Sequence, residues 1–364
     1  MTRFIAVLFS VLSVFGCMAG EGNMSNPFVY VAGYHNSITC FTLDMATGEL
    51  KPSSVSDGGK NPTYIAWSPN KKFMFACNEL DAGRVTAFSI NPKDGSLTKI
   101  NDAGCAGKGP CHVSVSPSGK WVFVANYGSG HFGVLPIKAD GSVGEPLENI
   151  LAGKNAHESF TDSTGKFLFV PCLGSDYVAQ YLFDDATGAV KPNDPPNAPG
   201  VPKAGPRHLT IHSNGKWAYL INEQGLTITS FMYDAAKGTL SDPQIVPTVP
   251  EGTDTKGKST AHIVVSPDGK FVYGSNRGFD DIVIYSIDQN TGRLTLVAHE
   301  NGGGDVKFPR DFTIDPTGKF VLVANQKGNS VTVFKRDAAS GKMEKLSTVE
   351  VPAGPSFVGV MTQP

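Results

Sequence analysis

The sequence predicts an all-β protein, a seven-bladed β-propeller with four antiparallel strands in each blade. Two repeated features of the 364 residues lead to this prediction. A phrase related to Ser-Pro-x-Gly-Lys-Phe occurs six times, at intervals of 48, 46, 50, 54 and 49 residues, and a turn containing glycine occurs seven times. A unit of roughly 40–50 residues that repeats in this way is typical of propeller blades.

The repeated phrase and the glycine turn divide each unit into four short strands. The phrase occupies residues 68–73, 116–121, 162–167, 212–217, 266–271 and 315–320. The recurrent turn glycines are Gly48, Gly95, Gly141, Gly188, Gly238, Gly292 and Gly341. In the unit around residue 270, strands are expected at 271–276, 281–287 and 293–297, because apolar residues alternate there and no helical period is present.

The two ends of the chain predict a closed ring. Residues 28–31 resemble a second strand without its first strand, and residues 354–358 resemble a first strand with nothing after it. We expect the C-terminal strand to complete the N-terminal blade, which leaves no open seam. The propeller domain would then span 28–362, with insertions between blades at 192–206 and 251–260.

Composition excludes several classes of protein. The net charge is −2 and 18 % of the residues are charged, which argues against a nucleic-acid binder. Forty per cent are hydrophobic, which excludes disorder. A closed ring needs no partner for stability, so we expect a monomer or a weak homodimer.

The first 19 residues resemble a signal peptide. Arg3 precedes an apolar run over 4–15, which is too short to span a membrane and suits the core of a leader. Cleavage after Ala19 would export a soluble protein to the periplasm or beyond; if the segment is no leader, the protein is cytoplasmic. Cys17 lies in a stretch resembling a lipoprotein box, but Phe15 departs from the small residue usual there, so simple export is favoured.

The cysteines do not form a disulfide scaffold. Without Cys17 five remain, which is an odd number. Cys105 and Cys111 flank a glycine-rich turn and could form a disulfide in an oxidising compartment. Cys77 and Cys172 lie in strand patterns and are expected to be buried. No Cys-x-x-Cys pair is present, so a zinc site has no support.

Alignment of the repeats places equivalent residues in three columns, and antiparallel pairing brings the columns to one mouth of the ring. The residue after the proline that begins each first strand is Thr63, Cys111, His157, Arg207, Ala261, Arg310 or Ser356. The next residue is Tyr64, His112, Glu158, His208, His262, Asp311 or Phe357. At the end of each second strand stands Tyr34, Glu79, Tyr127, Leu173, Glu223, Arg277 or Gln326.

Charged side chains from these columns predict a binding site for an anion. Three arginines, one histidine and two glutamates would meet at the mouth: Arg207, Arg277, Arg310, His157, Glu79 and Glu223. The alternative is a set of ion pairs between blades. His112, His208 and His262 recur in one column, which favours a structural role, whereas His157 is alone in its column.

Motifs of other enzyme classes are not supported. Residues 252–259 match the spacing of a phosphate-binding P-loop, but a strand rather than a helix follows them. The sequence contains neither a Gly-x-Ser-x-Gly elbow nor a His-Glu-x-x-His motif.

The chain resembles the lactonase family of seven-bladed propellers, which includes one type of 6-phosphogluconolactonase and the carboxymuconate-lactonizing enzymes. The resemblance covers nearly all of the mature chain. It is carried by Ala156-His157, Gly205-Pro206-Arg207-His208, Ile221-Asn222-Glu223, Ala261-His262, Ser275-Asn276-Arg277-Gly278, Pro309-Arg310 and Val323-Ala324-Asn325-Gln326. The family's proposed site is one histidine, two arginines and one glutamate, which the resemblance places at His157, Arg207, Arg277 and Glu223.

The resemblance implies hydrolysis of a sugar lactone, most simply 6-phosphogluconolactone, without a metal or other cofactor. The arginines would bind the anionic group and the carbonyl oxygen, and either His157 or Glu223 would be the base. Expected substrate-binding residues are Arg310, His208, Glu79, Tyr127 and Gln326. The alternatives are a muconate-type lactonizing isomerase and a non-catalytic exported binding propeller; a calcium-dependent gluconolactonase is disfavoured because arginines would repel the cation.

Overall fold

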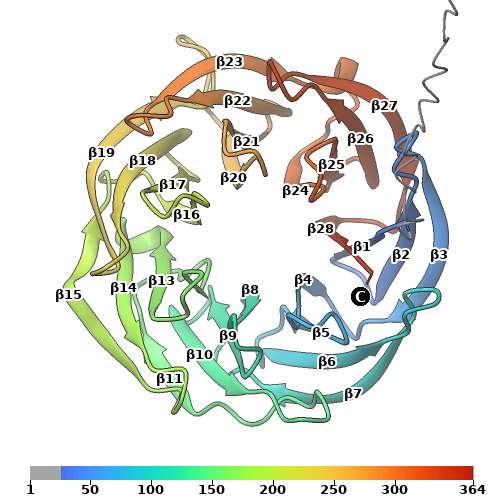
Figure 1. The fold of residues 1–364 in the computed structure, drawn as a ribbon, viewed down its shortest axis with the longest axis vertical. Helices are drawn as coiled ribbons and strands as arrows, with labels where there is room; N and C mark the ends of the chain where they lie inside the picture. Colours follow the sequence, from blue (N-terminus) through green and yellow to red (C-terminus); the bar gives the residue numbers. More distant parts are fainter. Residues whose placement is uncertain (1–25, 364) are drawn as a thin grey trace, which may run out of the picture.

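Seven four-stranded antiparallel sheets form a ring, as Figure 1 shows, and the region enclosed by their inner strands is the channel. The structure, a computed structural model, describes residues 26–363. The expected leader at 1–19, with Cys17, lies outside this range. No helix within it has the length and apolar character of a membrane span.

The strands follow one another around the ring, and the first strand of each sheet is the innermost. Blade 1 contains β28 (Pro355–Met361), β1 (Phe28–Gly33), β2 (Ser37–Leu43) and β3 (Leu50–Asp57). Blade 2 contains β4 (Pro62–Trp67), β5 (Phe73–Asn78), β6 (Arg84–Ile90) and β7 (Leu97–Gly104). Blade 3 contains β8 (Pro110–Val115), β9 (Trp121–Asn126), β10 (His131–Pro136) and β11 (Glu148–Leu151).

The remaining four blades repeat this order. Blade 4 contains β12 (Phe160–Thr161), β13 (Phe167–Cys172), β14 (Tyr177–Phe183) and β15 (Val190–Pro199). Blade 5 contains β16 (Pro206–Ile211), β17 (Trp217–Asn222), β18 (Thr227–Asp234) and β19 (Thr239–Pro247). Blade 6 contains β20 (Ser259–Val265), β21 (Phe271–Arg277), β22 (Asp281–Ile287) and β23 (Leu294–Glu300). Blade 7 contains β24 (Pro309–Ile314), β25 (Phe320–Asn325), β26 (Ser330–Arg336) and β27 (Met343–Glu350). Two 3₁₀ turns, Leu173–Ser175 and Gly302–Gly304, accompany them.

The ring closes as the sequence predicts. β28 pairs antiparallel with β1, and Val360 lies opposite Val29. The innermost strand of blade 1 thus comes from the C-terminus and the other three come from the N-terminus, so the inner edge of β1 is paired and no seam is left between the two ends.

The core lies between the blades. β9, β17 and β25 are buried along their whole length, whereas the outer strand β27 is exposed or partly exposed at every position after its first residue. One hydrophobic cluster joins Trp121 and Phe123 of blade 3 to Leu168 and Val170 of blade 4. Each sheet is therefore covered on both faces by its neighbours, which accounts for the apolar second strands.

The recurrent glycine turn is the joint between neighbouring blades. All seven turn glycines have φ between 67° and 84°, a left-handed conformation that favours glycine. A Cβ atom added to any of them would lie 2.1–2.6 Å from a side-chain atom of the preceding blade, such as Trp217 below Gly292 or Phe167 below Gly238. The Tyr219 hydroxyl also donates to the Gly292 carbonyl at 3.0 Å. These turns need glycine for both conformation and space.

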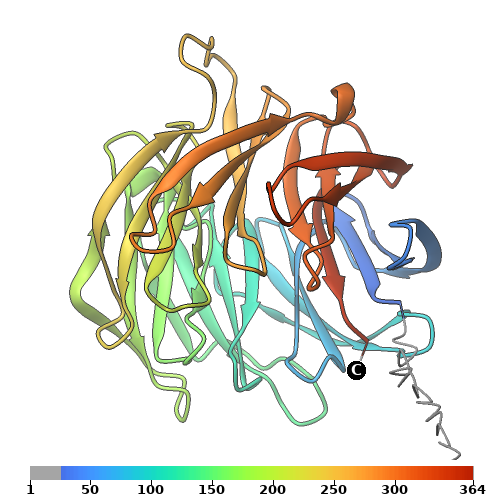
Figure 2. The same ribbon diagram turned by 45° about the horizontal axis from the view of Figure 1, so that its top comes forward.

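The interpretation of 192–206 as an insertion is wrong for its first part. Residues up to Pro199 belong to β15, the outer strand of blade 4, which pairs with β14 on its inner side. Prolines are tolerated there because an edge strand need not use every N–H group. Of the other expected insertion, 251–260, the part 251–258 is a loop between β19 and β20, which projects from the ring in Figure 2, and the last two residues begin β20.

The cysteines in the described range are free and buried. Cys105 donates to the Asn126 side chain at 2.9 Å, and Cys111 donates to the His157 carbonyl at 3.2 Å. The disulfide considered for Cys105 and Cys111 is therefore not formed. Cys77 and Cys172 are buried, as predicted.

Replacing Gly292 by alanine should destabilise the fold more than replacing Gly215. Both residues have φ near 70°, but nothing lies within 4 Å of a Cβ at Gly215, whereas Trp217 lies 2.5 Å from one at Gly292. Both variants would pay about 1–2 kcal/mol for the backbone conformation. Gly292→Ala should lose a further 1–3 kcal/mol or so through overpacking, measured by denaturant unfolding. Equal losses would contradict the assignment of this turn as a blade joint.

Candidate active site

A β-bulge at the start of four inner strands directs side chains towards one mouth of the channel. The pairing register shifts by one residue after the first proline of β4, β8, β16 and β24. The extra residues at these bulges are Thr63, Cys111, Arg207 and Arg310. Because a bulge re-aims a side chain, the first column of the repeat faces the mouth.

A cavity of about 250 Å³ lies at this mouth. It is lined by Tyr34, Glu79, Cys111, Tyr127, His157, Glu223, Arg277 and Arg310. All eight residues belong to the first and third columns derived from the repeat. Its volume lies near the small end of ligand pockets, which suits a ligand the size of one sugar.

Glu223 joins two guanidinium groups at the edge of this cavity. Its Oε2 accepts from Arg207 Nε at 2.9 Å and lies 2.9 Å from Arg277 Nη2. Arg277 also donates from Nε and Nη2 to the Thr260 carbonyl, and Arg207 donates to the Ala261 carbonyl. Burial and the charge of Arg207 lower the pKa of Arg277 to about 10, which leaves it cationic at neutral pH. These contacts tie blade 5 to blade 6.

Arg310 has no such counter-ion. Its guanidinium lies 5.5 Å from the centre of the Tyr34 ring, and within residues 26–363 it makes neither a hydrogen bond nor an ion pair of 4 Å or less. Tyr34 in turn donates its hydroxyl to Glu79 at 3.0 Å. The site thus holds three arginines and two glutamates, and one positive charge is left over.

His157 is a neutral base without a partner. It is 4 % exposed, its ring lies edge-on to Tyr127 with centroids 5.6 Å apart, and its Nδ1 makes no hydrogen bond with the described chain. Burial, and then the charges of Arg207, Arg310 and Arg277, hold its pKa well below the usual value. An unprotonated imidazole at the wall of a cavity can accept a proton from a ligand or a water molecule.

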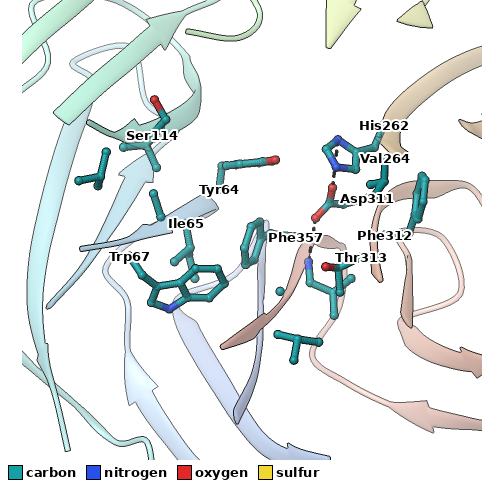
Figure 3. Close-up of a pocket in the computed structure, with 16 residues that line it drawn as sticks. Tyr64, Ile65, Trp67, Ser114, His262, Val264, Asp311, Phe312, Thr313 and Phe357 are labelled. Carbon is teal, nitrogen blue, oxygen red and sulfur yellow. Dashed lines mark hydrogen bonds and ion pairs between the residues drawn. The ribbon is translucent and has the colours of Figure 1, made fainter. Parts of the chain in front are cut away.

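A second layer of side chains fills the channel below the cavity. It consists of the second column: Tyr64, His112, Glu158, His208, His262, Asp311 and Phe357. Burial raises the pKa of Glu158 to about 8 and that of Asp311 to about 7, and it lowers the pKa of both His112 and His262 to about 3. Figure 3 shows Tyr64, His262 and Asp311 on the wall of a separate cavity of about 290 Å³, further along the inner strands.

The expected site residues therefore separate into three groups. His157, Glu223, Arg277, Arg310, Glu79 and Tyr127 line the cavity, and Arg207 lies directly beneath it. His208, expected to bind substrate, is 2 % exposed and does not line the cavity. Gln326 also lies outside the lining. Tyr34 and Cys111 line the cavity but were not singled out in the sequence, although both stand in its columns.

Phe308 marks the rim of the site with an unusual backbone conformation. It precedes the proline of β24 with φ of 54°, where the equivalent residues of five other blades are Asn61, Gly109, Asn155, Gly205 and Gly354. A bulky residue is rare in this conformation, and such strain gathers at functional sites. Its ring centre lies 3.9 Å from the Lys327 ammonium and 5.5 Å from the Arg277 guanidinium. Phe308 thus holds two cations at the mouth.

A family model described as "Lactonase, 7-bladed beta-propeller" matches residues 28–359, almost the whole of the described chain. The chain belongs to this lactonase family. The resemblance noted in the sequence is thereby confirmed, together with the number of blades.

Several relatives and solved structures are similar to this lactonase over most of their length. The 6-phosphogluconolactonase of Bacillus subtilis is 33 % identical over 300 residues, which cover 79 % of this chain and 83 % of the relative. That of Formosa agariphila is 32 % identical over 342 residues, which cover 89 % and 95 %. A periplasmic gluconolactonase of Pseudomonas aeruginosa superposes with a TM-score of 0.86 and 30 % identity, covering 93 % of this chain and all of that one.

Replacing Glu158 by glutamine should stabilise this lactonase increasingly as the pH rises. The Glu158 pKa is raised from 4.5 to about 8 by burial, so the folded state binds one more proton than the unfolded state between these values. Stability contributed by this group is therefore lost as the pH rises. Glutamine can still accept from the Leu209 N–H, as Glu158 does at 2.6 Å, and carries no charge.

The measurement is thermal unfolding of both proteins from pH 5 to pH 9. The unfolding free energy of Glu158→Gln should exceed that of wild type by an amount that grows with pH and is on the order of a few kcal/mol at pH 9. Parallel curves for the two proteins would show that Glu158 ionises in the fold as it does in the unfolded chain.

Proposed function

We propose that this lactonase hydrolyses an aldonolactone at the cavity of about 250 Å³, and that 6-phosphogluconolactone suits the cavity best. The observation that carries the proposal is that the side chains of Arg310 and His157 lie at the same cavity and that neither has a hydrogen-bond or ion-pair partner among residues 26–363. Ion pairs that serve only to join blades would be satisfied within the protein, as the contacts of Glu223 with Arg207 and Arg277 are. A free guanidinium and a free base side by side favour an anionic ligand that needs a proton removed from water.

In this mechanism His157 is the general base. Water attacks the carbonyl carbon of the lactone while its proton passes to the imidazole. Negative charge develops on the carbonyl oxygen, which Arg277 stabilises from a fixed position. The tetrahedral intermediate then collapses, the bond to the ring oxygen breaks, and the imidazolium returns the proton to that oxygen.

Glu223 supports this chemistry by holding the two arginines. Its Oε2 already accepts from both guanidinium groups, whereas the imidazole of His157 makes no hydrogen bond with the described residues. This contrast favours His157 over Glu223 as the base, a choice that the sequence left open. Arg310 is left to bind the phosphate of the substrate.

A second candidate substrate is the unphosphorylated gluconolactone. The expected leader at 1–19 and the similarity to a periplasmic gluconolactonase favour export, and a phosphorylated sugar is a metabolite of the cytosol. An exported enzyme would meet the plain lactone, and Arg310 would then bind a hydroxyl group or a carboxylate.

Replacing His157 by asparagine should lower kcat by roughly 10²–10⁴-fold with little change in KM, because the base is lost and the cavity is kept. The assay follows acid release from both lactones above the spontaneous rate. His131→Asn is the matched control, since His131 lies on β10 outside the cavity lining and binds the Ser129 carbonyl. Unchanged kinetics for His157→Asn would contradict the mechanism.

The same assay with Arg310→Met identifies the substrate. If the phosphorylated lactone is used, KM should rise for that substrate alone, by about 10- to 100-fold for the loss of a charge-assisted hydrogen bond. Wild-type acceleration of the plain lactone alone would favour the exported enzyme. Acceleration of neither lactone would favour a lactonizing isomerase or a binding propeller.

A further inference from the structure

Three side chains, which we call the file, lie in a row beneath Arg207. His208 and Asp311 are buried, and His262 is 16 % exposed. Arg207 Nη1 lies 3.3 Å from His208 Nε2, and His208 Nδ1 lies 2.7 Å from His262 Nδ1. His262 Nδ1 is also 3.5 Å from Asp311 Oδ1. These residues come from β16, β20 and β24, so the file crosses three blades beneath the cavity.

We propose that His208, His262 and Asp311 position Arg207 for catalysis, and that they do so only while Asp311 carries a proton. The proposal rests on the proposed function, because Arg207 would act in lactone hydrolysis through Glu223, whose Oε2 it shares with Arg277. In it the three residues of the file are positioning residues, since none of them lines the cavity that would hold the substrate.

The hydrogen-bonding capacity of arginine fixes the first part of the file. A guanidinium can only donate, so His208 must accept at Nε2 and carry its proton on Nδ1. That proton is then donated to His262 Nδ1, and His262 carries its own proton on Nε2. One arrangement of protons therefore satisfies both contacts with neutral rings.

Asp311 decides whether this arrangement persists. Its Oδ2 accepts from the Val358 N–H at 3.0 Å, while its Oδ1 has no hydrogen-bond partner in the described chain and faces His262 Nδ1. A protonated Asp311 carries no charge, so its Oδ1 can lie 3.5 Å from that nitrogen while the nitrogen's lone pair accepts from His208. An ionised Oδ1 would instead require a proton on His262 Nδ1, because two lone pairs would otherwise face each other in a buried site.

Loss of the Asp311 proton therefore changes the tautomer of both rings. With a proton on His262 Nδ1, His208 Nδ1 becomes the acceptor and His208 carries its proton on Nε2. That N–H would then face the N–H of Arg207, and the contact at 3.3 Å would become repulsive. The file then carries one proton fewer, and Arg207 loses its hydrogen-bond acceptor at His208 Nε2.

The groups around Asp311 place this change near neutral pH. Its burial raises its pKa to about 7, although Arg207 and Arg310 favour the ionised form. Three other ionisable groups lie nearby. Tyr64 and Asp311 both line the cavity of about 290 Å³, His112 contacts the Tyr64 ring, and Glu158 lies 3.6 Å from His112. Figure 3 shows Asp311 between His262 and the backbone of β28, with both contacts drawn.

The test compares kcat/KM for the lactone between pH 6 and pH 9 in wild type and in Asp311→Asn. Asparagine can accept from the Val358 N–H and places no charge beside His262, so it reproduces the neutral carboxyl. Wild-type kcat/KM above the spontaneous rate should fall by roughly 10- to 100-fold as the pH rises through 7 to 9, the loss expected for one hydrogen bond to a charged group. Asp311→Asn should keep its activity at pH 9. Glu158→Gln is the control, since Glu158 is buried in the same layer but does not contact the file, and it should keep the wild-type fall.

The outcomes separate this proposal from the proposed function. No wild-type hydrolysis at any pH would overturn the proposed function. Hydrolysis with the same fall at high pH in Asp311→Asn and wild type would overturn the role of the file alone. If Asp311→Asn does not fold, nitrogen NMR of wild-type histidines decides: the His208 proton should move from Nδ1 at pH 6 to Nε2 at pH 9, and a fixed tautomer would contradict the proposal.

Discussion

The contact between a glycine turn and the neighbouring blade, repeated seven times, is the constraint on which the rest of the structure depends. Each turn places a left-handed glycine against a side chain of the preceding blade, an aromatic ring in most cases, where no Cβ would fit. Seven nearly equal contacts make a ring of fixed radius, which β28 closes by pairing with β1. This ring sets the width of the mouth of the channel. It thereby sets the distance between residues as far apart in sequence as Tyr34 and Arg310.

Much of the site could be predicted from the sequence, because residues at the same position in different blades lie at the same level of the ring. All eight residues of the cavity stand in two of the three columns, including Tyr34 and Cys111. The columns did not show whether a given side chain lies at the mouth or deeper in the channel. Adjacent residues of a strand differ in direction, and the bulge after the first proline sends Arg207 to the mouth and His208 into the channel. The strand formed by 190–199 was also missed, since its prolines indicate a loop unless the strand is known to lie at an edge.

The electrostatics of the mouth follow from which charges are already paired. Glu223 is shared by Arg207 and Arg277 and serves to hold them, whereas Arg310 and His157 are left for a ligand. Below them, burial keeps three histidines neutral and favours the protonated forms of Glu158 and Asp311. A nearly uncharged layer of side chains therefore lies beneath the cationic groups of the mouth. A layer of charged groups at this depth would have to be solvated or paired.

The most direct test of this account is a crystal structure with 6-phosphogluconate, the product of the proposed reaction. The account predicts that the product occupies the cavity at the mouth, with its carboxylate within hydrogen-bonding distance of Arg277 and His157 and its phosphate at Arg310. Binding of the product elsewhere, for example in the cavity beside Tyr64 and His262, would contradict the assignment of this mouth as the active site.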